Sequence, residues 1–384
     1  MRVFSVIIFS PDDHIAYDLN TLDDIGLGGG ATARIRMAHA LAGRGHRVDL
    51  YINCPQEKYI EGVNYHHFKS FQSQKADIFI ASSSGGGLSL AGLLSIPSAN
   101  ISKILLIEGD EFPIDVNLMN FDHYYVLSNY VRKKLFSRHP EYNRYFVTNH
   151  GIQKSQFERG SINNDPHKLA YASHPSKGLK SAIMVFEKIK RQDKRFELHV
   201  FGDERLWGGK LASILSNFQE TSGIINHSLI GQKLLAKELM SCGFYIALQS
   251  RPEPFGIIIG EAQFAGCIVL ASPAGAFSEI INNGINGYLF EGNPEDASTI
   301  ANIVSKIMEL TENPKIMEQV RANGEKTPID WQVCAETWVA HWNWILNHPE
   351  HNNSSAPQVC EECGGEEISF KDGIHCLKCG RFRR

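Results

Sequence analysis

The fold is decided by a stretch in the middle of the chain, where two apolar runs flank a helical pattern. The stretch reads Leu169-Ala170-Tyr171-Ala172, then a helical pattern over 179–190, then Phe196-Glu197-Leu198-His199-Val200-Phe201-Gly202. Continuous apolar strands separated by helices are typical of a parallel sheet that is covered on both faces. The stretch therefore predicts a doubly wound α/β unit.

The same alternation extends in both directions from this stretch. We expect two Rossmann-like domains, 1–152 and 153–347, which face a cleft and bind ligands at the carboxyl ends of their strands. The expected strands are 3–9, 47–52, 77–81, 101–107, 124–127 and 145–148 in the first domain and 244–248 and 268–271 later in the second; the expected helices are 31–42, 129–136, 232–240 and 256–264.

The C-terminal part begins with a tryptophan-rich helical pattern. Residues 331–346 predict a last helix that is long enough to pack across both domains. Residues 348–358 are rich in Asn, Ser and Pro, as in a polar linker. Residues 359–384 therefore read as a separate module.

Composition excludes several classes of protein. The 384 residues are 43% hydrophobic and 21% charged, so a disordered chain, a collagen-like fibre and a disulfide mini-protein are excluded. A net charge of −4 gives no basic footprint, so the composition argues against nucleic acid as a partner. No run approaches the roughly 18 apolar residues of a membrane span, and the N-terminus lacks a secretory pattern. We expect a cytoplasmic protein without a transmembrane segment.

A glycine-rich loop lies between the first strand and the helix over 31–42. It reads Gly26-Leu27-Gly28-Gly29-Gly30-Ala31, and the amides of Gly29 and Gly30 are candidates for binding a donor phosphate at a helix N-terminus. The spacing is not that of the dinucleotide motif. The alternative is a flexible loop that only enters a helix.

Two carboxylates stand eight positions apart in residues 251–262. Glu253 lies in a proline-flanked loop after a strand, and Glu261 lies inside the following helix. Glu253 can face a ligand, while Glu261 can accept hydrogen bonds from a ribose. The alternative is a helix-capping acid with a solvated helix acid. The backbone amides that suit phosphate or sugar oxygens belong to Phe255, Gly256 and Ile257.

Residues 253–261, together with 264–269, Gly275, 279–281 and 286–289, resemble the donor-binding half of the GT-B glycosyltransferases of the family-4 retaining group. The resemblance spans about residues 1–347 and is less specific in the N-terminal half, at 29–30, 41–42, 45–48 and 126–131. It implies a GT-B fold and transfer of a sugar, with retention, from a nucleotide-diphosphate sugar to a hydroxyl acceptor.

The resemblance also implies roles for single residues. Glu253 would contact the donor sugar, Glu261 would hold the nucleotide ribose, and Lys177 would bind the diphosphate, whose charge grows as the glycosidic bond breaks. The family commonly has an arginine five positions before this lysine, where this chain has Ala172. Arg251 or His174 are candidates to replace it, and a solvent-facing role is the alternative for each.

The acceptor side departs from the family pattern. Many relatives have a histidine after a strand of the first domain, whereas this chain has Glu108 and Asp110. We expect Asp110 or Glu108 to orient the acceptor hydroxyl or act as a base; loop solvation is the alternative. The sequence contains no Asp-x-Asp motif, so we expect no divalent metal in catalysis.

The last module carries two Cys-x-x-Cys pairs, Cys360 with Cys363 and Cys376 with Cys379. Four thiolates satisfy tetrahedral zinc, so the pattern predicts a structural zinc ribbon. A redox pair is the less favoured alternative. Five basic and five acidic residues balance in this module, which favours docking of a protein over nucleic acid.

Three classes of function remain at this point. The first is the glycosyltransferase, whose acceptor could be a saccharide, a lipid-linked group, a protein or a small molecule. The second is a nucleotide-sugar epimerase or a phosphorylase with the same fold. The third is a non-catalytic binding protein that docks through its zinc ribbon.

Overall fold

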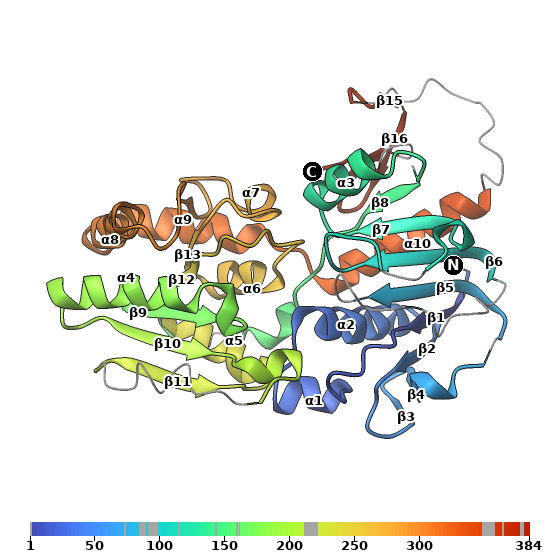
Figure 1. Cartoon of the computed structure of the whole chain (residues 1–384), viewed down its shortest axis with the longest axis horizontal. Helices are drawn as coiled ribbons and strands as arrows, with labels where there is room; N and C mark the ends of the chain where they lie inside the picture. Colours follow the sequence, from blue (N-terminus) through green and yellow to red (C-terminus); the bar gives the residue numbers. More distant parts are fainter. Residues whose placement is uncertain are drawn as a thin grey trace. The chain divides into compact units, whose positions relative to one another are not determined.

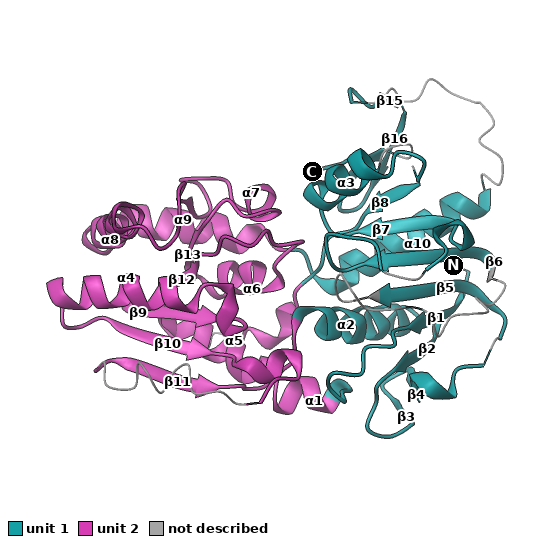
Figure 2. Cartoon of the chain, viewed as in Figure 1, with its two compact units in different colours: residues 1–19, 29–151, 329–384 teal, residues 20–28, 152–328 magenta. Residues whose placement is uncertain are grey.

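The computed structural model of the chain separates into two compact units, drawn in teal and magenta in Figure 2. Both units are built on mainly parallel sheets with helices on their faces (Figure 1), which confirms the expected α/β fold class. Unit 1 comprises residues 1–19, 29–151 and 329–384, and unit 2 comprises residues 20–28 and 152–328. The structure describes residues 2–72, 74–83, 90, 99–113, 116–142, 144–158, 160, 162–210, 222–347, 358–362, 365–376 and 380–384.

Unit 1 contains an eight-stranded sheet in the order β3-β4-β2-β1-β5-β6-β7-β8. Its strands pair in parallel except for β3, which is antiparallel to β4. The order reverses between β1 and β5, so this gap is the topological switch point of the sheet. The strands are β1 (Ser5–Phe9), β2 (Arg47–Ile52), β3 (Lys58–Ile60), β4 (Val63–His67), β5 (Ala76–Ser83), β6 (Ala99–Ile107), β7 (His123–Val126) and β8 (Tyr145–Val147).

Within the residues that the structure describes, α2, α3 and α10 are the longer helices that cover this sheet. α3 (Asn129–Arg138) buries Val131 and Leu135 on the face that also presents alternate residues of β1, β5, β6 and β7. α2 (Gly29–Gly43) and α10 (Trp331–Asn347) pack against each other, α2 also contacting β2 and α10 also contacting β6. The tryptophan-rich helix is therefore part of unit 1. The short 3-10 turns η1 (Phe68–Ser70) and η2 (Leu118–Asn120) also belong to unit 1.

The C-terminal tail forms a four-stranded antiparallel sheet in the order β15-β16-β17-β18. It packs on β8 and α3: Phe382 joins the core of unit 1, and its backbone N–H and C=O bond the side chain of Asn129 at 2.8 and 2.6 Å. The sequence predicted a separate module, but these contacts integrate the tail with unit 1. The strands are β15 (Gln358–Val359), β16 (Glu366–Phe370), β17 (Gly373–Cys376) and β18 (Phe382–Arg383).

Unit 2 contains a six-stranded, wholly parallel sheet in the order β11-β10-β9-β12-β13-β14. The order reverses between β9 and β12, which is the switch point of this sheet. Its strands are β9 (Asp165–Ala172), β10 (Glu197–Phe201), β11 (Ile224–Ser228), β12 (Cys242–Ala247), β13 (Ile268–Ala271) and β14 (Tyr288–Leu289). Its helices are α4 (Leu179–Gln192), α5 (Gln232–Ser241), α6 (Ile257–Ala265), α7 (Phe277–Ile280), α8 (Ala297–Glu312) and α9 (Pro314–Lys326). Its 3-10 turns are η3 (Lys154–Gln156), η4 (Pro175–Lys177) and η5 (Glu204–Trp207).

Side chains of one strand enter both cores of unit 2. Leu169 and Tyr171 point into the core that α4, α8 and α9 complete, while Ala170 and Ala172 point into the core with α5, α6 and α7. This alternation is the period of two expected for a strand that is buried on both faces. The sheet is thereby fixed between two helical layers.

A short N-terminal segment belongs to unit 2. Helix α1 (Leu19–Asp24) leads out of unit 1, and a Cβ on Gly231 would lie 1.6 Å from the carbonyl oxygen of Asp23. Only glycine permits this approach of the two backbones. Among the residues that the structure describes, no helix has the length and apolar character needed to cross a membrane.

Candidate active site

Lys177 and Glu253 form an ion pair at the switch point of unit 2. Lys177 ends η4, directly after β9, and Glu253 lies in the loop after β12. The Lys177 Nζ atom is 3.0 Å from Oε1 and 2.8 Å from Oε2 of Glu253. Their side chains are 22% and 14% exposed, so solvent or a ligand reaches both charges.

The loop holds Glu253 from two sides. The Gln249 amide donates a hydrogen bond to Glu253 Oε2 at 3.1 Å. The backbone N–H of Glu253 donates to Ala274 O, and its C=O accepts from Ala276 N. Gly275 stands between these two residues with φ +64°, and a Cβ there would lie 2.5 Å from Glu253 O. The carboxylate therefore has a fixed position.

Lys177 is fixed by the glycine that follows it. Gly178 has φ +100°, and a Cβ at this position would lie 1.8 Å from the carbonyl oxygen of Leu248. The turn before it is anchored by Tyr171, whose hydroxyl donates to His174 O at 2.7 Å. The chain can therefore bring Lys177 against the end of β12 only with glycine at position 178.

Helix α6 begins at Ile257, four positions after Glu253. Gly256, with φ +92°, precedes the first helical residue, and Phe277 packs where its Cβ would be. The side chains of Phe255 and Ile257 are buried, each residue being 8% exposed. The first-turn amides that the sequence singled out thus lie within four residues of Glu253, at the positive end of the helix dipole.

Glu261 is buried in α6, with Gln232 Nε2 at 3.4 Å from its Oε1. Burial raises the pKa of Tyr245 well above its usual range, and Glu261 and Glu253 raise it further, so both carboxylates lie near this ring. The Tyr245 hydroxyl donates to the carbonyl oxygen of Ala172 at 3.0 Å. Ala172, which stands where the family commonly has an arginine, is buried in the core of unit 2.

Trp207 is a site residue that the sequence reasoning missed. Its ring, 43% exposed, stacks on His174 with centroids 3.8 Å apart, and Lys177 Nζ and Arg251 Cζ lie 5.7 and 5.8 Å from its centroid. Burial lowers the pKa of His174, and the neighbouring Lys177 and Arg251 lower it further. His174 is therefore neutral at pH 7, and Arg251 is the second cation beside Lys177.

A second polar cluster lies at the switch point of the sheet in unit 1. Arg34, only 1% exposed on α2, donates to Tyr17, Ser82, Glu108 and Asp12 at 2.9, 3.3, 2.8 and 2.7 Å. The two carboxylates follow β1 and β6, and the serine lies on β5. The cluster thus gathers one cation and two anions at the carboxyl edge, where such sheets bind ligands.

The charge state of this cluster follows from its burial. Burial raises the pKa of Glu108 to about 7; Arg34 opposes the shift and Asp12 adds to it. Burial and Arg34 lower the pKa of His150 to about 3, so its imidazole stays neutral. Glu108 therefore exchanges its proton near neutral pH, as an acid–base group must.

Asp110 occupies a different environment from Glu108. Its carboxylate pairs with Lys134 of α3 at 2.5 Å, and both side chains are partly exposed. The buried cluster therefore contains Glu108 and not Asp110. Gly29 and Gly30 are the first residues of α2, which also carries Arg34, and their role in donor binding stays a prediction.

The predicted zinc ribbon is described in part. Cys360 and Cys376 are each 1% exposed and pack together, whereas Cys363 and Cys379 lie outside the described residues. Two thiols buried side by side in a small antiparallel sheet fit half of a four-cysteine zinc site.

The segment that holds Lys177 and Glu253 is similar in sequence to known proteins. Residues 153–327 match the family described as "Glycosyl transferases group 1". An uncharacterised glycosyltransferase of Methanocaldococcus jannaschii is 28% identical over 222 residues, 56% of this chain and 57% of the relative. A phosphatidyl-myo-inositol mannosyltransferase of Mycobacterium tuberculosis is 31% identical over 102 residues, 26% of this chain and 27% of the relative. The chain thus spans about half or less of the length of these curated relatives.

The fold is shared with solved glycosyltransferase structures. A glycosyltransferase from Rickettsia africae superposes with a TM-score of 0.66 over 89% of this chain and 98% of its own, at 14% identity. At this identity the likeness concerns the fold alone, which is the GT-B type that the sequence predicted. Residues 153–327, which contain the Lys177–Glu253 pair, are therefore similar in sequence to the glycosyl transferases group 1 family.

Proposed function

We propose that the protein is a retaining glycosyltransferase that moves a sugar from a nucleotide-diphosphate sugar to a hydroxyl acceptor. The observation that carries the proposal is the Lys177–Glu253 pair at the switch point of unit 2, just before the N-terminus of α6. A cation, a carboxylate and helix amides at one sheet edge suit a diphosphate joined to a polyol. The group 1 family match supports the reaction class.

In this proposal the donor rearranges the ion pair. A diphosphate beside Lys177 competes for the ammonium group, which frees Glu253 to accept hydrogen bonds from the sugar hydroxyls. As the glycosidic bond breaks, negative charge grows on the leaving phosphate, and fixed positive groups stabilise it. Glu261, which lies inside α6, would accept hydrogen bonds from the ribose hydroxyls.

Arg251 supplies the cation that the family commonly takes from the position of Ala172. It shares the Trp207 ring with Lys177, and a guanidinium binds phosphate oxygens in a bidentate manner. The exposed Trp207 ring also offers a stacking surface to the nucleoside. His174 packs behind it as a neutral partner.

Unit 1 would bind the acceptor through the Arg34 cluster. Glu108 is the candidate that orients the acceptor hydroxyl, because it lies in the buried cluster and exchanges its proton near pH 7. In a retaining reaction the leaving phosphate oxygen would take the acceptor proton on the same face of the sugar. Asp110, bound to Lys134, would have to leave that ion pair to act.

We also propose that the transfer needs no divalent metal. The support is in the sequence, which lacks the Asp-x-Asp motif that binds a metal–nucleotide complex. The four-cysteine zinc proposed for the tail would be structural, because such a site keeps no open coordination position.

A thermal-shift panel of nucleoside diphosphates and their sugars tests the donor class, since a ligand stabilises by RT ln(1 + [L]/Kd). The expected result is stabilisation by one cognate family of nucleotides, lost in Lys177→Met. Product analysis with that donor should then show a glycoside of unchanged anomeric configuration. Release of an epimerised sugar, or consumption of the donor with phosphate alone, would favour the alternative enzymes, and no nucleotide binding would contradict the proposal.

A further inference from the structure

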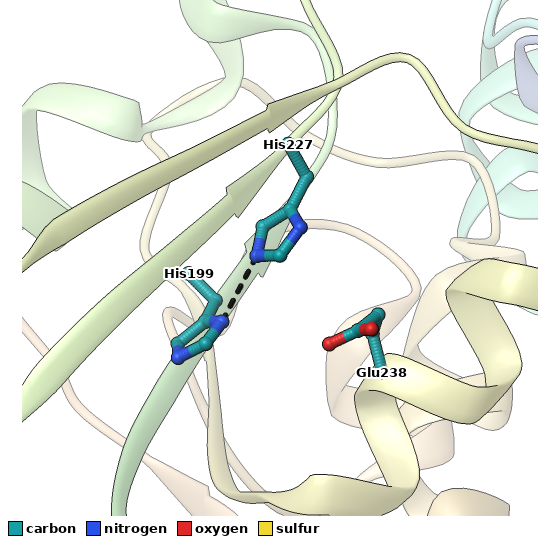
Figure 3. Close-up of side chains that lie close together, drawn as sticks. All are labelled: His199, His227 and Glu238. Atoms are coloured by element: carbon teal, nitrogen blue, oxygen red, sulfur yellow. Dashed lines mark hydrogen bonds between the residues drawn. The ribbon is translucent and has the colours of Figure 1, made fainter.

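His199, His227 and Glu238 of unit 2 lie together on β10, β11 and α5 (Figure 3). Their ligand atoms all lie within 4.8 Å of one another. His199 is buried, and the other two residues are half-buried. None of the three is among the residues of the proposed donor site. His199 is the central residue of β10, whereas the donor residues follow strand ends.

The two imidazoles face each other through their nitrogens. His199 Nδ1 and His227 Nε2 are 3.0 Å apart. Two ligands of a tetrahedral ion at 2.0–2.1 Å are separated by about 3.3 Å, so a small opening of the pair admits an ion between them. Glu238 offers a third ligand atom, and a water molecule can complete the four positions.

A carboxylate also stands behind the buried imidazole. Glu197 Oε2 is 3.5 Å from His199 Nε2, and within the described part of the chain this buried nitrogen has no hydrogen-bond partner. A metal on Nδ1 fixes the proton on Nε2, where it can be donated to Glu197. Carboxylate–histidine–metal arrangements of this kind orient the ring and strengthen its binding.

The charges around the pair keep the ligands available. The two imidazole rings lie among more acidic than basic side chains. Glu197 and Glu238 are the acidic groups that act on them, and Lys168 is the basic group. Two carboxylates against one ammonium favour a bound cation.

We propose that His199, His227 and Glu238 bind one divalent transition-metal ion of the zinc class. Two imidazoles and one carboxylate suit zinc and its neighbours, whereas magnesium and calcium prefer oxygen ligands. The ion would tie the edge strand β11 to β10 and α5. Its role would be structural.

Such a tie would also support the loop that carries Trp207. Ser228, directly after His227, has φ +58°, and its hydroxyl donates to Asp203 at 2.7 Å. Arg205, two residues before Trp207, bonds both Asp203 and Ser228. Fixing His227 therefore restrains the backbone to which this loop is bonded.

Metal counting on the full-length protein tests the proposal. Wild type and His227→Gln are each incubated with zinc chloride, freed of unbound metal by gel filtration, and analysed for zinc per chain. We expect one zinc ion fewer in His227→Gln, because the cysteine tail is the same in both. His167→Gln, which changes another histidine of unit 2, is the matched control and should keep the wild-type count.

Two further variants keep the test decisive if His227→Gln fails to fold. Glu238→Gln removes a half-buried ligand from α5 and should also lose the ion, while Glu197→Gln should weaken zinc affinity by about 10–100-fold in calorimetry. Equal zinc counts in wild type and the folded ligand variants would overturn the proposal. Equal stabilisation by magnesium and zinc in thermal unfolding would also overturn it.

Discussion

At the scale of single residues, the Lys177–Glu253 pair joins two partly exposed side chains at a sheet edge. Ion pairs reached by solvent contribute only about 0–1 kcal/mol to stability. The backbone around the pair is nevertheless tightly held, by Gly178 on one side and Gly275 on the other. Such fixed positions matter for binding and catalysis more than for the free energy of unfolding.

Glu253→Gln should therefore lower kcat by about 10²–10³-fold, the loss typical of removing one group that stabilises charge in a transition state. The Tm should change little, because the pair contributes little to stability. Steady-state kinetics with the cognate donor and calorimetric unfolding measure the two quantities. Glu187→Gln on α4 is the control and should keep wild-type kcat; a wild-type kcat in folded Glu253→Gln would remove this residue from the site.

Glu108 should make stability depend on pH in a defined direction. Its pKa is raised to about 7 in the folded protein from an ordinary 4.5, because burial penalises its charge. The folded state therefore holds this proton more tightly, and the stabilisation is present below pH 4.5 and is lost as pH rises through 7. Glutamine mimics the protonated acid, so the Tm of wild type minus that of Glu108→Gln should fall between pH 5 and pH 8. A difference that stays constant or rises would contradict the assignment.

The sequence pointed to Lys177, Glu253 and Glu261 one by one, through their motif, but not to the ion pair, which depends on two strands meeting at the switch point. Arg34 escaped notice because a charged residue in a helix normally faces solvent, and nothing local shows that four partners from distant segments surround it. Trp207 escaped notice because an isolated tryptophan more often belongs to a core.

At the scale of elements, the turn from β9 into α4 depends on Gly178. Gly178→Ala should destabilise the protein by about 2–4 kcal/mol, because the new Cβ meets Leu248 O and the φ of +100° strains any other residue. The turn must shift, so nucleotide affinity should fall as Lys177 moves. Chemical denaturation and nucleotide calorimetry measure both effects.

Gly284 provides the matched control for this substitution. It also has a positive φ, +78°, but nothing lies within 4 Å of its Cβ position. Gly284→Ala should cost only about 1–2 kcal/mol, the strain of the left-handed region, and should leave nucleotide binding intact. Equal losses at the two positions would show that the contact with Leu248 O is not the cause.

Buried strands were easier to predict than edge strands. The apolar runs of β1, β2, β9, β10, β12 and β13 follow from burial on both faces of a parallel sheet. β4 (Val63–His67) and β11 (Ile224–Ser228) lie at or beside a sheet edge and carry asparagine and histidine, so their patterns are too polar to predict strands.

At the scale of the whole molecule, the C-terminal tail is integrated with unit 1. Arg132, whose side chain is 2% exposed, donates to Glu362 of the tail, and Phe382 fills the core beside β8. Deleting residues 358–384 should therefore destabilise unit 1 by at least about 2 kcal/mol, through the cavity left by Phe382 and the loss of the Arg132–Glu362 ion pair. Hydrogen exchange should rise in β8 and α3, whereas nucleotide affinity should be unchanged because unit 2 lacks the tail.

A single substitution tests whether the lost packing of Phe382, and not only the loss of the whole tail, causes the destabilisation. Phe382→Ala should reproduce part of the destabilisation, while Leu346→Ala, at a partly exposed position on α10, should have little effect. If the deletion left the hydrogen-exchange rate of β8 unchanged, the tail would not stabilise unit 1. Local patterns could not predict this packing, because the polar linker suggests an independent module and the contacting residues are 230 and 253 positions apart in the sequence.

The discontinuous path of unit 1 has a consequence for synthesis on the ribosome. Its sheet is translated within the first 151 residues, but α10 and the tail that cover it come only after residue 329. At a translation rate of roughly 5–20 residues per second, β6 and β8 remain without these packing partners for about 10–50 s. Unit 2 is complete by residue 328 and can fold during that interval. In a nascent chain stalled near residue 360, unit 2 should therefore become resistant to protease first. Unit 1 should still be accessible to chaperones.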